Sequence, residues 1–326
     1  MNTKTQLLKL LEHKRGAYIS GAALAKELSV SRNAVWKAVE LLRAEGYGIS
    51  AATNKGYMLT SIGDALSEAG IAAHLQTEGV FRIDIRSSVE STNTTLRSLA
   101  AEGAPEGYVV VAETQSAGKG RMGKSFHSPA GHGAYFSLLL RPGQTSDSAL
   151  ITSAAAVAAA LAIEQVTGVK VGIKWVNDLY LGEKKVCGIL TEATYDMESG
   201  TIGSAVLGIG INTTKPEGGY PDGLEGIAAP LTPEKRGKDG ERCRLIAATL
   251  DTFWGYYQNL SERSFLDEYR SRSVLLGRDI YVLANETERP ARALAIDDDC
   301  RLVVRYSDGE TAALNSGEVR VKPNNK

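Results

Sequence analysis

The segment QSAGKGRMGK, residues 115–124, combines three glycines with three basic side chains. Glycine lets a backbone adopt positive φ and approach a ligand closely. The charges of Lys119, Arg121 and Lys124 are not offset nearby, because residues 114–146 contain no Asp or Glu. Such a loop suits an anion, specifically a phosphate or an acyl-phosphate. Glycine-rich basic loops are also common at surfaces, so the charge pattern alone leaves an anion site and a flexible turn equally open.

The spacing excludes two well-known phosphate-binding loops. The GxxxxGK[ST] order of a Walker loop is absent. The letters GxGxxG do occur at Gly118–Gly123, but a dinucleotide fingerprint opens a helix, whereas this loop leads to an apolar run that predicts a strand at 135–140.

Two further stretches place polar residues beside apolar strands. In KWVNDLY, residues 174–180, Asn177 and Asp178 separate two apolar runs. A plain Asn-Asp turn satisfies such groups at little cost, so the stretch alone indicates a turn. Lys185 precedes the apolar run 186–190. A lysine there either reaches water at a sheet edge or is held as a cation for a ligand.

The elements that must position these residues alternate between strand and helix. We predict strands at 81–86, 108–113, 135–140, 171–175, 179–181, 184–193 and 202–211. We predict helices at 64–70, 91–102, 147–167, 242–260 and 264–272. Residues 213–240 are rich in Gly, Pro and charge and predict a mobile loop.

The first sixty residues differ in charge from the rest: they hold nine Lys and Arg against four Glu, on a chain whose net charge is −1. The pattern predicts helices at 4–13, after Ser20 and at 32–45, then two short strands joined by a turn at 54–56. This is the order of a winged helix-turn-helix, whose second paired helix enters the DNA major groove. A small helical domain without DNA is the alternative. The candidate DNA contacts are Ser20, Ser31, Arg32, Asn33, Lys37, Arg43 and Lys55.

After residue 276 the pattern changes to short alternating runs, which suit a small antiparallel barrel. We therefore predict an α+β protein with domains at 1–62, 63–275 and 276–326.

Three widely spaced cysteines argue against a disulfide framework or a structural zinc site and suit the cytoplasm. Neither a secretory signal nor an apolar run of membrane-spanning length is found in the sequence.

Taken together and in order, the motifs resemble those of biotin protein ligases. Gly118–Phe126 is similar to that family's GRGRxGRxW, Lys174–Asp178 to its KWPND, Lys185–Leu190 to its KxxGIL and Gly208–Asn212 to its GxGxN. The departures are Lys119 and Lys124 for Arg, Phe126 for Trp and Val176 for Pro. Lysine keeps the charge but loses the bidentate fork of arginine, so these departures bear on affinity more than on reaction type.

The resemblance covers the whole chain. It implies an N-terminal winged helix-turn-helix, a central mixed α/β catalytic domain like those of class II aminoacyl-tRNA synthetases and biotin and lipoate ligases, and a C-terminal SH3-like barrel. It implies that biotin reacts with ATP, with Mg²⁺ present, to give biotinyl-5′-adenylate. A lysine of the biotin carboxyl carrier protein of acetyl-CoA carboxylase, or of another biotin-dependent carboxylase, then displaces AMP. It also implies a homodimer that binds operator DNA and represses biotin genes.

The resemblance also implies roles for individual residues. The catalytic residues are Arg121, Lys185 and Asp178. The biotin-binding residues are Ser91, Thr92, Asn93, Gln115, Gly118, Lys119, Gly120, Arg121, Lys185 and Gly188. The ATP-binding residues are Arg121, Met122, Gly123, Lys124, Phe126, Asn177, Asp178 and Asn212. No residue is assigned as a resident metal ligand, although Asp178 is expected to organise either Mg²⁺ or the attacking amine.

Three alternatives remain open from the sequence. A lipoate-type ligase would share the fold and the adenylation chemistry. A ligand-responsive repressor would bind biotin without catalysis. A ligase whose N-terminal domain has lost operator binding would keep only the enzymatic role. Under the main hypothesis, Arg121 and Lys185 must lie on one cavity.

Overall fold

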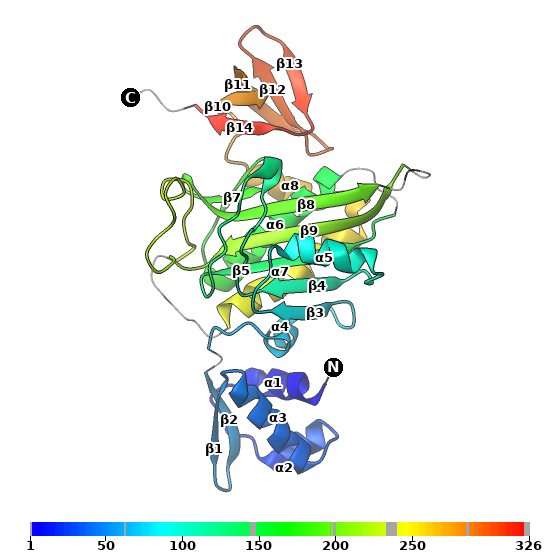
Figure 1. Cartoon of the computed structure of the whole chain (residues 1–326), viewed down its shortest axis with the longest axis vertical. Coiled ribbons are helices and arrows are strands. Elements are labelled where there is room, and N and C mark those ends of the chain that lie inside the picture. Colours follow the sequence, from blue (N-terminus) through cyan, green and yellow to red (C-terminus); the bar gives the residue numbers. More distant parts are fainter. Residues whose placement is uncertain are drawn as a thin grey trace.

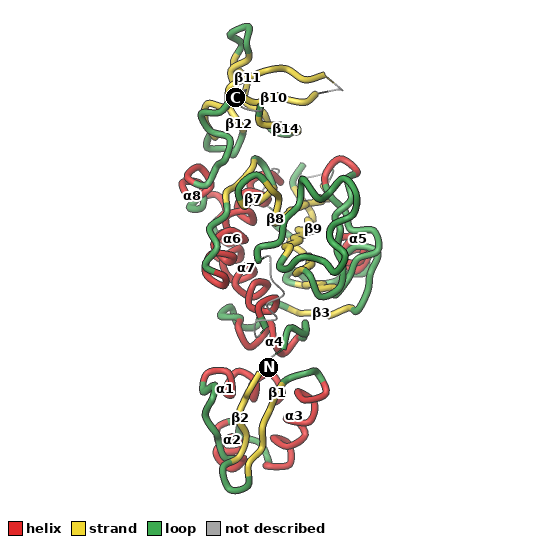
Figure 2. The backbone as a smooth tube through the Cα atoms, turned by 90° about the vertical axis from the view of Figure 1, so that its left-hand side faces the viewer, coloured by secondary structure: helices red, strands yellow, loops and turns green. Residues whose placement is uncertain are grey.

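The computed structural model describes residues 2–61, 63–143, 148–195, 197, 200–232, 240–284 and 287–322. Three bodies follow one another along the long axis: a helical body at the N-terminus, a broad sheet with helices, and a small sheet near the C-terminus (Figure 1). The view turned by 90° shows the same order (Figure 2). The predicted α+β class and the order of the three parts are confirmed.

The first body is a winged helix-turn-helix, as predicted. It contains α1 (Thr3–His13), α2 (Gly21–Glu27), α3 (Arg32–Ala44) and the antiparallel wing strands β1 (Gly48–Ala52) and β2 (Gly56–Ser61). Ser20 and Ser31 begin α2 and α3, because their hydroxyls accept hydrogen bonds from the N–H groups of Ala23 and Ala34, at 3.1 Å each. Side chains of this type cap helix N-termini by satisfying otherwise free backbone donors.

The central body is built on a seven-stranded sheet in the order β3-β4-β5-β9-β8-β7-β6. The strands are β3 (Arg82–Arg86), β4 (Tyr108–Ala112), β5 (Gly133–Leu140), β6 (Gly172–Lys174), β7 (Asp178–Leu181), β8 (Lys184–Tyr195) and β9 (Ile202–Asn212). Only β3 and β4 run parallel, and the other neighbouring pairs are antiparallel. The strands β8 and β9, which carry two of the sequence motifs, are therefore adjacent inside the sheet.

Helices cover both faces of this sheet. α5 (Thr92–Ala101) packs on one face, where Leu96 meets Val110, Leu139 and Val206 in a small core. α6 (Ser148–Thr167) and α7 (Glu241–Gln258) pack together over the larger core on the other face, and α8 (Leu266–Ser271) follows them. The alternation of side chains along β4 explains the two cores, since Val109 and Val111 point away from Val110.

α6 is apolar on all sides because it is buried on all sides. By length and composition alone α6 could cross a membrane, but 72% of its apolar 18-residue stretch is buried inside the structure. It packs against α7 and against several strands of the sheet, as a core helix does. Asp147, which was predicted to begin this helix, lies outside the described residues.

The helix predicted at 64–70 is wrong in position, because α4 spans Glu68–His74. The residues before it make hydrogen bonds to the start of α7 instead of helical ones. Ala69 and Ala73 belong to the core of the winged helix, whereas Ile71 belongs to the central core. α4 therefore joins the two bodies by contributing a face to each.

The loop predicted at 213–240 pairs with the start of β8 at residues 227–229. The Lys185 N–H donates to the Ile227 carbonyl at 2.8 Å, and the Lys185 carbonyl accepts from the Ala229 N–H at 2.9 Å. Residues 233–239 of that prediction lie outside the described residues.

The third body is an antiparallel sheet in the order β13-β12-β11-β10-β14. Its strands are β10 (Asp279–Ala284), β11 (Thr287–Ile296), β12 (Leu302–Tyr306), β13 (Thr311–Leu314) and β14 (Glu318–Val321). Its buried residues continue the central core, and the Trp175 indole N–H donates to the Cys300 carbonyl at 2.8 Å. The small sheet is thus packed directly behind the KWVND turn.

Candidate ligand-binding site

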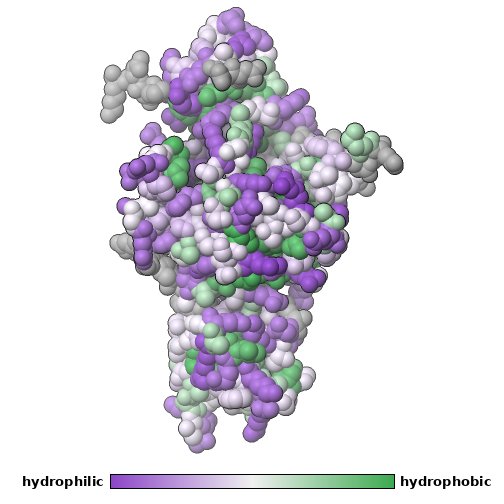
Figure 3. All heavy atoms as spheres, in the orientation of Figure 1, coloured by the Kyte–Doolittle hydropathy of each residue, from purple (hydrophilic) through white to green (hydrophobic). Residues whose placement is uncertain are grey.

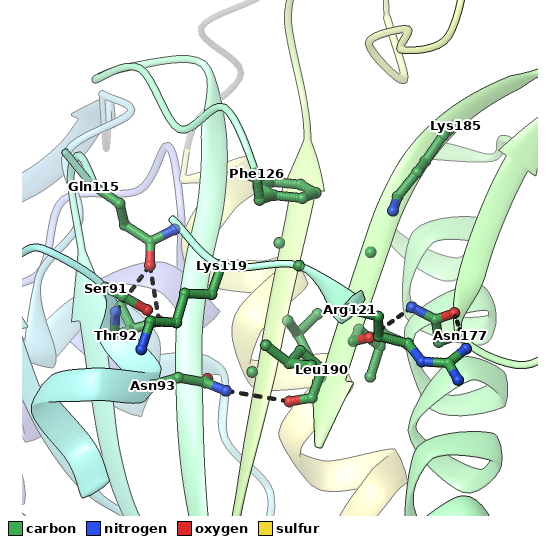
Figure 4. Close-up of a pocket in the computed structure, with 16 residues that line it drawn as sticks. Ser91, Thr92, Asn93, Gln115, Lys119, Arg121, Phe126, Asn177, Lys185 and Leu190 are labelled. Carbon is green, nitrogen blue, oxygen red and sulfur yellow. Dashed lines mark hydrogen bonds between the residues drawn. The ribbon is translucent and has the colours of Figure 1, made fainter. Parts of the chain in front are cut away.

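A cavity lies between the glycine-rich loop, the start of α5, and the strands β8 and β9 (Figure 4). Its lining includes Ser91, Thr92, Asn93, Gln115, Lys119, Gly120, Arg121, Phe126, Asn177, Lys185 and Gly188, all of which were predicted for the site. It is completed by Ile189, Leu190, Gly208, Ile209 and Gly210, which were not assigned roles. The structure therefore places Arg121 and Lys185 on one cavity, as the main hypothesis requires.

The neutral end of the cavity is organised by the Gln115 side chain. Gln115 Oε1 accepts a hydrogen bond from the Thr92 backbone N–H at 2.8 Å, and Gln115 Nε2 donates to Ser128 Oγ at 2.7 Å. Ser91 and Thr92 are almost fully buried at the start of α5. Hydrogen-bonding groups are thus held in fixed positions, which suits recognition of a neutral polar ligand group.

Ser137, in the middle of β5, supports this end and is absent from the predicted site. It is fully buried, donates a hydrogen bond to Asn93 Oδ1 at 2.6 Å and lies with its oxygen 2.7 Å from Thr92 Oγ1. Asn93 Nδ2 in turn donates to Glu192 Oε2 at 2.8 Å. The only sequence signal for Ser137 is a single serine in the largely apolar run 133–140.

Two glycines on adjacent strands make room for the Phe126 ring. Gly188 of β8 pairs in register with Gly210 of β9. A Cβ atom added at these positions would lie 3.0 Å and 2.5 Å from ring atoms of Phe126. Any larger residue would therefore displace the ring, so the two glycines form a flat ledge under an aromatic side chain.

Arg121 and Lys185 lie at the other end of the cavity, whereas the Lys119 side chain extends toward Thr92 and Asn93 (Figure 4). Arg121 Nη1 donates to Asn177 Oδ1 at 3.2 Å, and Lys185 Nζ lies 2.8 Å from Asp178 Oδ1. Burial lowers the pKa of Lys174, the first residue of the same motif, and the attraction of Asp178 opposes this only in part. Cations held in a partly dehydrated site interact strongly with a phosphate, since less water screens them.

Six predicted residues do not line the cavity: Gly118, Met122, Gly123, Lys124, Asp178 and Asn212. Asp178 still contacts the site through Lys185. Met122 has a φ of 54° and a side chain that is 74% exposed, so it points into solvent from the turn at Arg121–Gly123. Lys124 Nζ binds Glu318 Oε1 of β14 at 2.6 Å instead.

The first body presents a polar helix surface. Arg32, Asn33 and Lys37 are exposed along α3, where Trp36 is also half exposed. Lys55, at the tip of the wing, lies with Nζ 5.9 Å from the centre of the Tyr18 ring. The space-filling view shows hydrophilic side chains over much of this end, with a small hydrophobic patch among them (Figure 3). Such a surface fits a nucleic-acid backbone.

The Arg43 side chain makes hydrogen bonds within the first body. Its Nε and Nη2 atoms donate to the Ile49 carbonyl of β1 at 3.0 Å and 2.7 Å, and Nη1 binds Glu40 at 2.8 Å. The guanidinium therefore fastens the wing to α3, and this role was not foreseen when Arg43 was predicted to contact DNA.

Comparisons with known proteins agree with this architecture. A model of the biotin/lipoate A/B protein ligase family matches residues 86–212, an HTH domain model matches residues 3–58, and a biotin protein ligase C-terminal domain model matches residues 276–321. The chain is 35% identical over 311 residues to the bifunctional ligase/repressor BirA of Bacillus subtilis (strain 168), covering 94% of this chain and 95% of that one. It is 32% identical over 214 residues to the BirA of Escherichia coli (strain K12), or 65% of each chain.

A solved structure, the biotin protein ligase of Aquifex aeolicus in complex with biotin and ATP, matches with a TM-score of 0.63 at 25% identity. The match covers 74% of this chain and 98% of that chain. The fold is therefore that of a biotin or lipoate ligase with a helix-turn-helix domain in front. Within that class, the chain belongs to the family of bifunctional biotin protein ligase/repressors.

Proposed function

We propose that the cavity binds biotin at its neutral end and ATP at its charged end, and joins them as biotinyl-5′-adenylate. The observation that carries this proposal is that Arg121 and Lys185 line the same cavity as Ser91, Thr92 and Gln115. The ureido ring of biotin fits the neutral hydrogen-bonding end, whereas a carboxylate and phosphates fit the cationic end.

The reaction proceeds in two displacements. A biotin carboxylate oxygen attacks the α-phosphorus of ATP, so an oxygen–phosphorus bond forms and the bond to pyrophosphate breaks. The ε-amine of a carrier lysine then attacks the acyl carbon, AMP leaves, and the amine loses a proton. Both steps build negative charge on phosphate or carbonyl oxygens. Arg121 and Lys185 are the groups that stabilise this charge, because preorganised cations act most strongly where water is excluded.

The glycine-rich loop retains the mixed anhydride and keeps water from it. Arg121 anchors the loop to Asn177 across the cavity. We predict that Arg121→Gly releases biotinyl-5′-adenylate into solution at least about tenfold faster than the wild type, since the loss of a charged donor costs 1.5–3 kcal/mol. Release is measured by rapid filtration of enzyme loaded with labelled adenylate. Equal retention by the variant would remove Arg121 from this role.

Magnesium fits the site only together with the nucleotide. No group of three or more His, Cys, Asp or Glu within the described residues is arranged to hold a metal ion. Mg²⁺ commonly uses one or two carboxylates plus substrate phosphates. Asp178 is a carboxylate at the charged end and would hold the ion against the phosphates, where Mg²⁺ neutralises part of their charge.

The enzyme assay combines the protein with biotin, ATP, Mg²⁺ and the biotin-accepting domain of a carboxyl carrier protein, and is read by mass spectrometry. We expect the gain of one biotin on one lysine. Substituting lipoate for biotin tests the lipoate-type alternative. Transfer of lipoate and not biotin would support that alternative, and the absence of any transfer would support a repressor without catalysis.

We further propose that the winged helix represses transcription by binding operator DNA as part of a homodimer. The exposed Arg32, Asn33 and Lys37 on α3 support DNA contact. A dimer would present two such helices to a two-fold operator. The test is a gel shift with a biotin-operon promoter, with and without biotin and ATP. Sedimentation of the protein without DNA, under the same two conditions, measures its oligomeric state. A ligand-saturated monomer at micromolar concentration would contradict the dimer.

Carriers of biotin-dependent carboxylases and operator DNA are thus the proposed macromolecular partners. We place the protein in the cytoplasm, where its three buried cysteines remain as free thiols.

A further inference from the structure

Arg242, which does not line the cavity, carries a charged guanidinium that is buried. Arg242 lies in the first turn of α7, and its side chain is 5% exposed. A guanidinium keeps its proton in proteins, and a buried charge needs ionic or hydrogen-bonding partners. The partners of Arg242 come from two distant parts of the chain: the segment that leaves the winged helix, and the two ends of the glycine-rich loop.

On one side, α7 holds the segment that leaves the winged helix. Arg242 Nε donates to Asp64 Oδ2 at 2.8 Å, and Nη2 donates to the Asp64 carbonyl. Just before the helix, the Gly240 N–H donates to the Gly63 carbonyl at 2.6 Å. Burial raises the pKa of Asp64, and the guanidinium of Arg242 opposes that rise. The connection to the winged helix is thereby fixed to the central body.

On the other side, the same guanidinium binds both ends, or roots, of the connection between β4 and β5, which contains the glycine-rich segment and which we call the ligand loop. Arg242 Nη1 donates to Glu113 Oε1 at 2.9 Å, and that oxygen also accepts from the Gly131 N–H at 2.8 Å. Arg242 Nη1 is also 3.4 Å from the Gly133 carbonyl. Glu113 begins the loop and Gly131 and Gly133 end it, with Arg121 between them. Any movement of the loop roots therefore acts on the group that also holds Asp64.

We propose that Arg242 is a positioning residue that couples the placement of the winged helix to the ligand loop, so that ligand and operator binding influence each other through it. This inference rests on the proposed function. Closure of the loop over the adenylate shifts or stiffens its roots, and the Arg242–Asp64 contact transmits the change to the segment that carries the DNA-binding body. Thermodynamic linkage makes such coupling reciprocal: operator DNA must tighten ligand binding by the factor by which ligand tightens operator binding.

The chain supplies a matched control for the loss of a buried arginine. The Arg272 side chain is likewise 5% exposed and binds two carboxylates, those of Glu164 and Glu268. Its partners lie on α6 and α8, away from the ligand loop. Replacing either Arg242 or Arg272 should therefore lower the stability of the protein, whereas only the replacement of Arg242 should weaken the coupling between ligand and operator binding.

The experiment measures operator affinity by fluorescence anisotropy, with and without saturating biotin and ATP, for the full-length protein. The ratio of the two affinities is the coupling factor, which we expect to be roughly 5–150 in the wild type. In Arg242→Met it should fall to about one, and in Arg272→Met it should keep its wild-type value. Circular dichroism checks that both variants are folded at the assay temperature.

Two milder variants separate the two sides and do not depend on Arg242→Met folding. Asp64→Asn should lower the coupling factor at least threefold while leaving the KM for biotin and the ligase kcat unchanged. Glu113→Gln should lower the coupling factor and also raise the KM for biotin, because it loosens the loop roots. Arg242→Lys, which keeps the charge but not the fork, should lie between Arg242→Met and the wild type.

An unchanged coupling factor in Arg242→Met, or in Asp64→Asn if the former does not fold, overturns the proposal. A coupling factor of one in the wild-type protein would also overturn the proposal. That result would not bear on the ligase assay, which is a separate measurement. Failure of the proposed enzyme shows separately, as the absence of biotin on the carrier lysine.

Discussion

The two ends of the cavity are built on opposite principles. At the neutral end, Gln115 is already hydrogen-bonded to Thr92, and the fully buried Ser137 is hydrogen-bonded to both Thr92 and Asn93. At the charged end, Lys185 and Asp178 remain 24% and 22% exposed and form one ion pair. The neutral end is preformed and selects its ligand by fixed hydrogen bonds. The charged end reaches its full set of interactions only when an anion replaces water around its cations.

The largest effect that distinguishes the two ends should come from Lys185→Ala. The substitution removes a cation at the atoms where charge develops, so adenylate formation should slow by a factor of about 100 or more. The Kd for biotin should rise by a smaller factor than the rate falls, because the neutral end is intact and only the contact with the carboxylate is lost. ATP–pyrophosphate exchange measures the rate, and titration calorimetry measures biotin binding.

The neighbouring lysine serves as the control. Lys184 Nζ donates to the Glu225 carbonyl and points away from the cavity lining. Lys184→Ala should therefore keep adenylate formation within about twofold of the wild type, as surface substitutions generally do. If both alanine variants lost the same activity, a general charge effect would explain the result better than a role of Lys185 in the site.

Ser137→Ala should have a smaller effect, and this effect should fall on biotin binding and not on the rate of the reaction. Removal of the hydroxyl leaves Asn93 Oδ1 without its donor inside the core, a loss of about 1–3 kcal/mol. Part of this appears as lower stability and part as misplacement of Thr92, so the KM for biotin should rise roughly fivefold to tenfold while kcat stays near its wild-type value. A fall in kcat at unchanged KM would show that the neutral end is not merely a recognition surface.

These expectations show what the sequence can and cannot reveal. The caps at Ser20 and Ser31, the wing and the strands were predictable because each depends on residues close together in the chain. The facing of Gly188 and Gly210 depends on the register of β8 against β9, which motif spacing does not contain. Ser137 and Arg242 were missed for the same reason, since their partners lie in distant segments. The position of α4 was missed although its cap is local: Ser67 begins the helix by accepting a hydrogen bond from the Gly70 N–H at 2.9 Å.

The smallest expected effect concerns the contact between Lys124 and Glu318, whose side chains are 62% and 39% exposed. An exposed ion pair contributes 1 kcal/mol at most and is screened by salt. Glu318→Gln should therefore change the KM for ATP by less than about fivefold, with the difference vanishing near 1 M salt. Steady-state kinetics at two ionic strengths measure it, and Glu310→Gln, on the same small sheet and bound to Arg289, is the matched control.

The direction of that small change is informative. If Lys124 contacts phosphate, release from Glu318 frees it for the nucleotide, and the KM for ATP should fall slightly. If Glu318 instead holds Lys124 in place for the nucleotide, the KM should rise. A loss as large as that expected for Lys185→Ala would mean that the small C-terminal sheet completes the charged end before any ligand binds. The contrast between a preformed end and an end completed by its ligand would then be wrong.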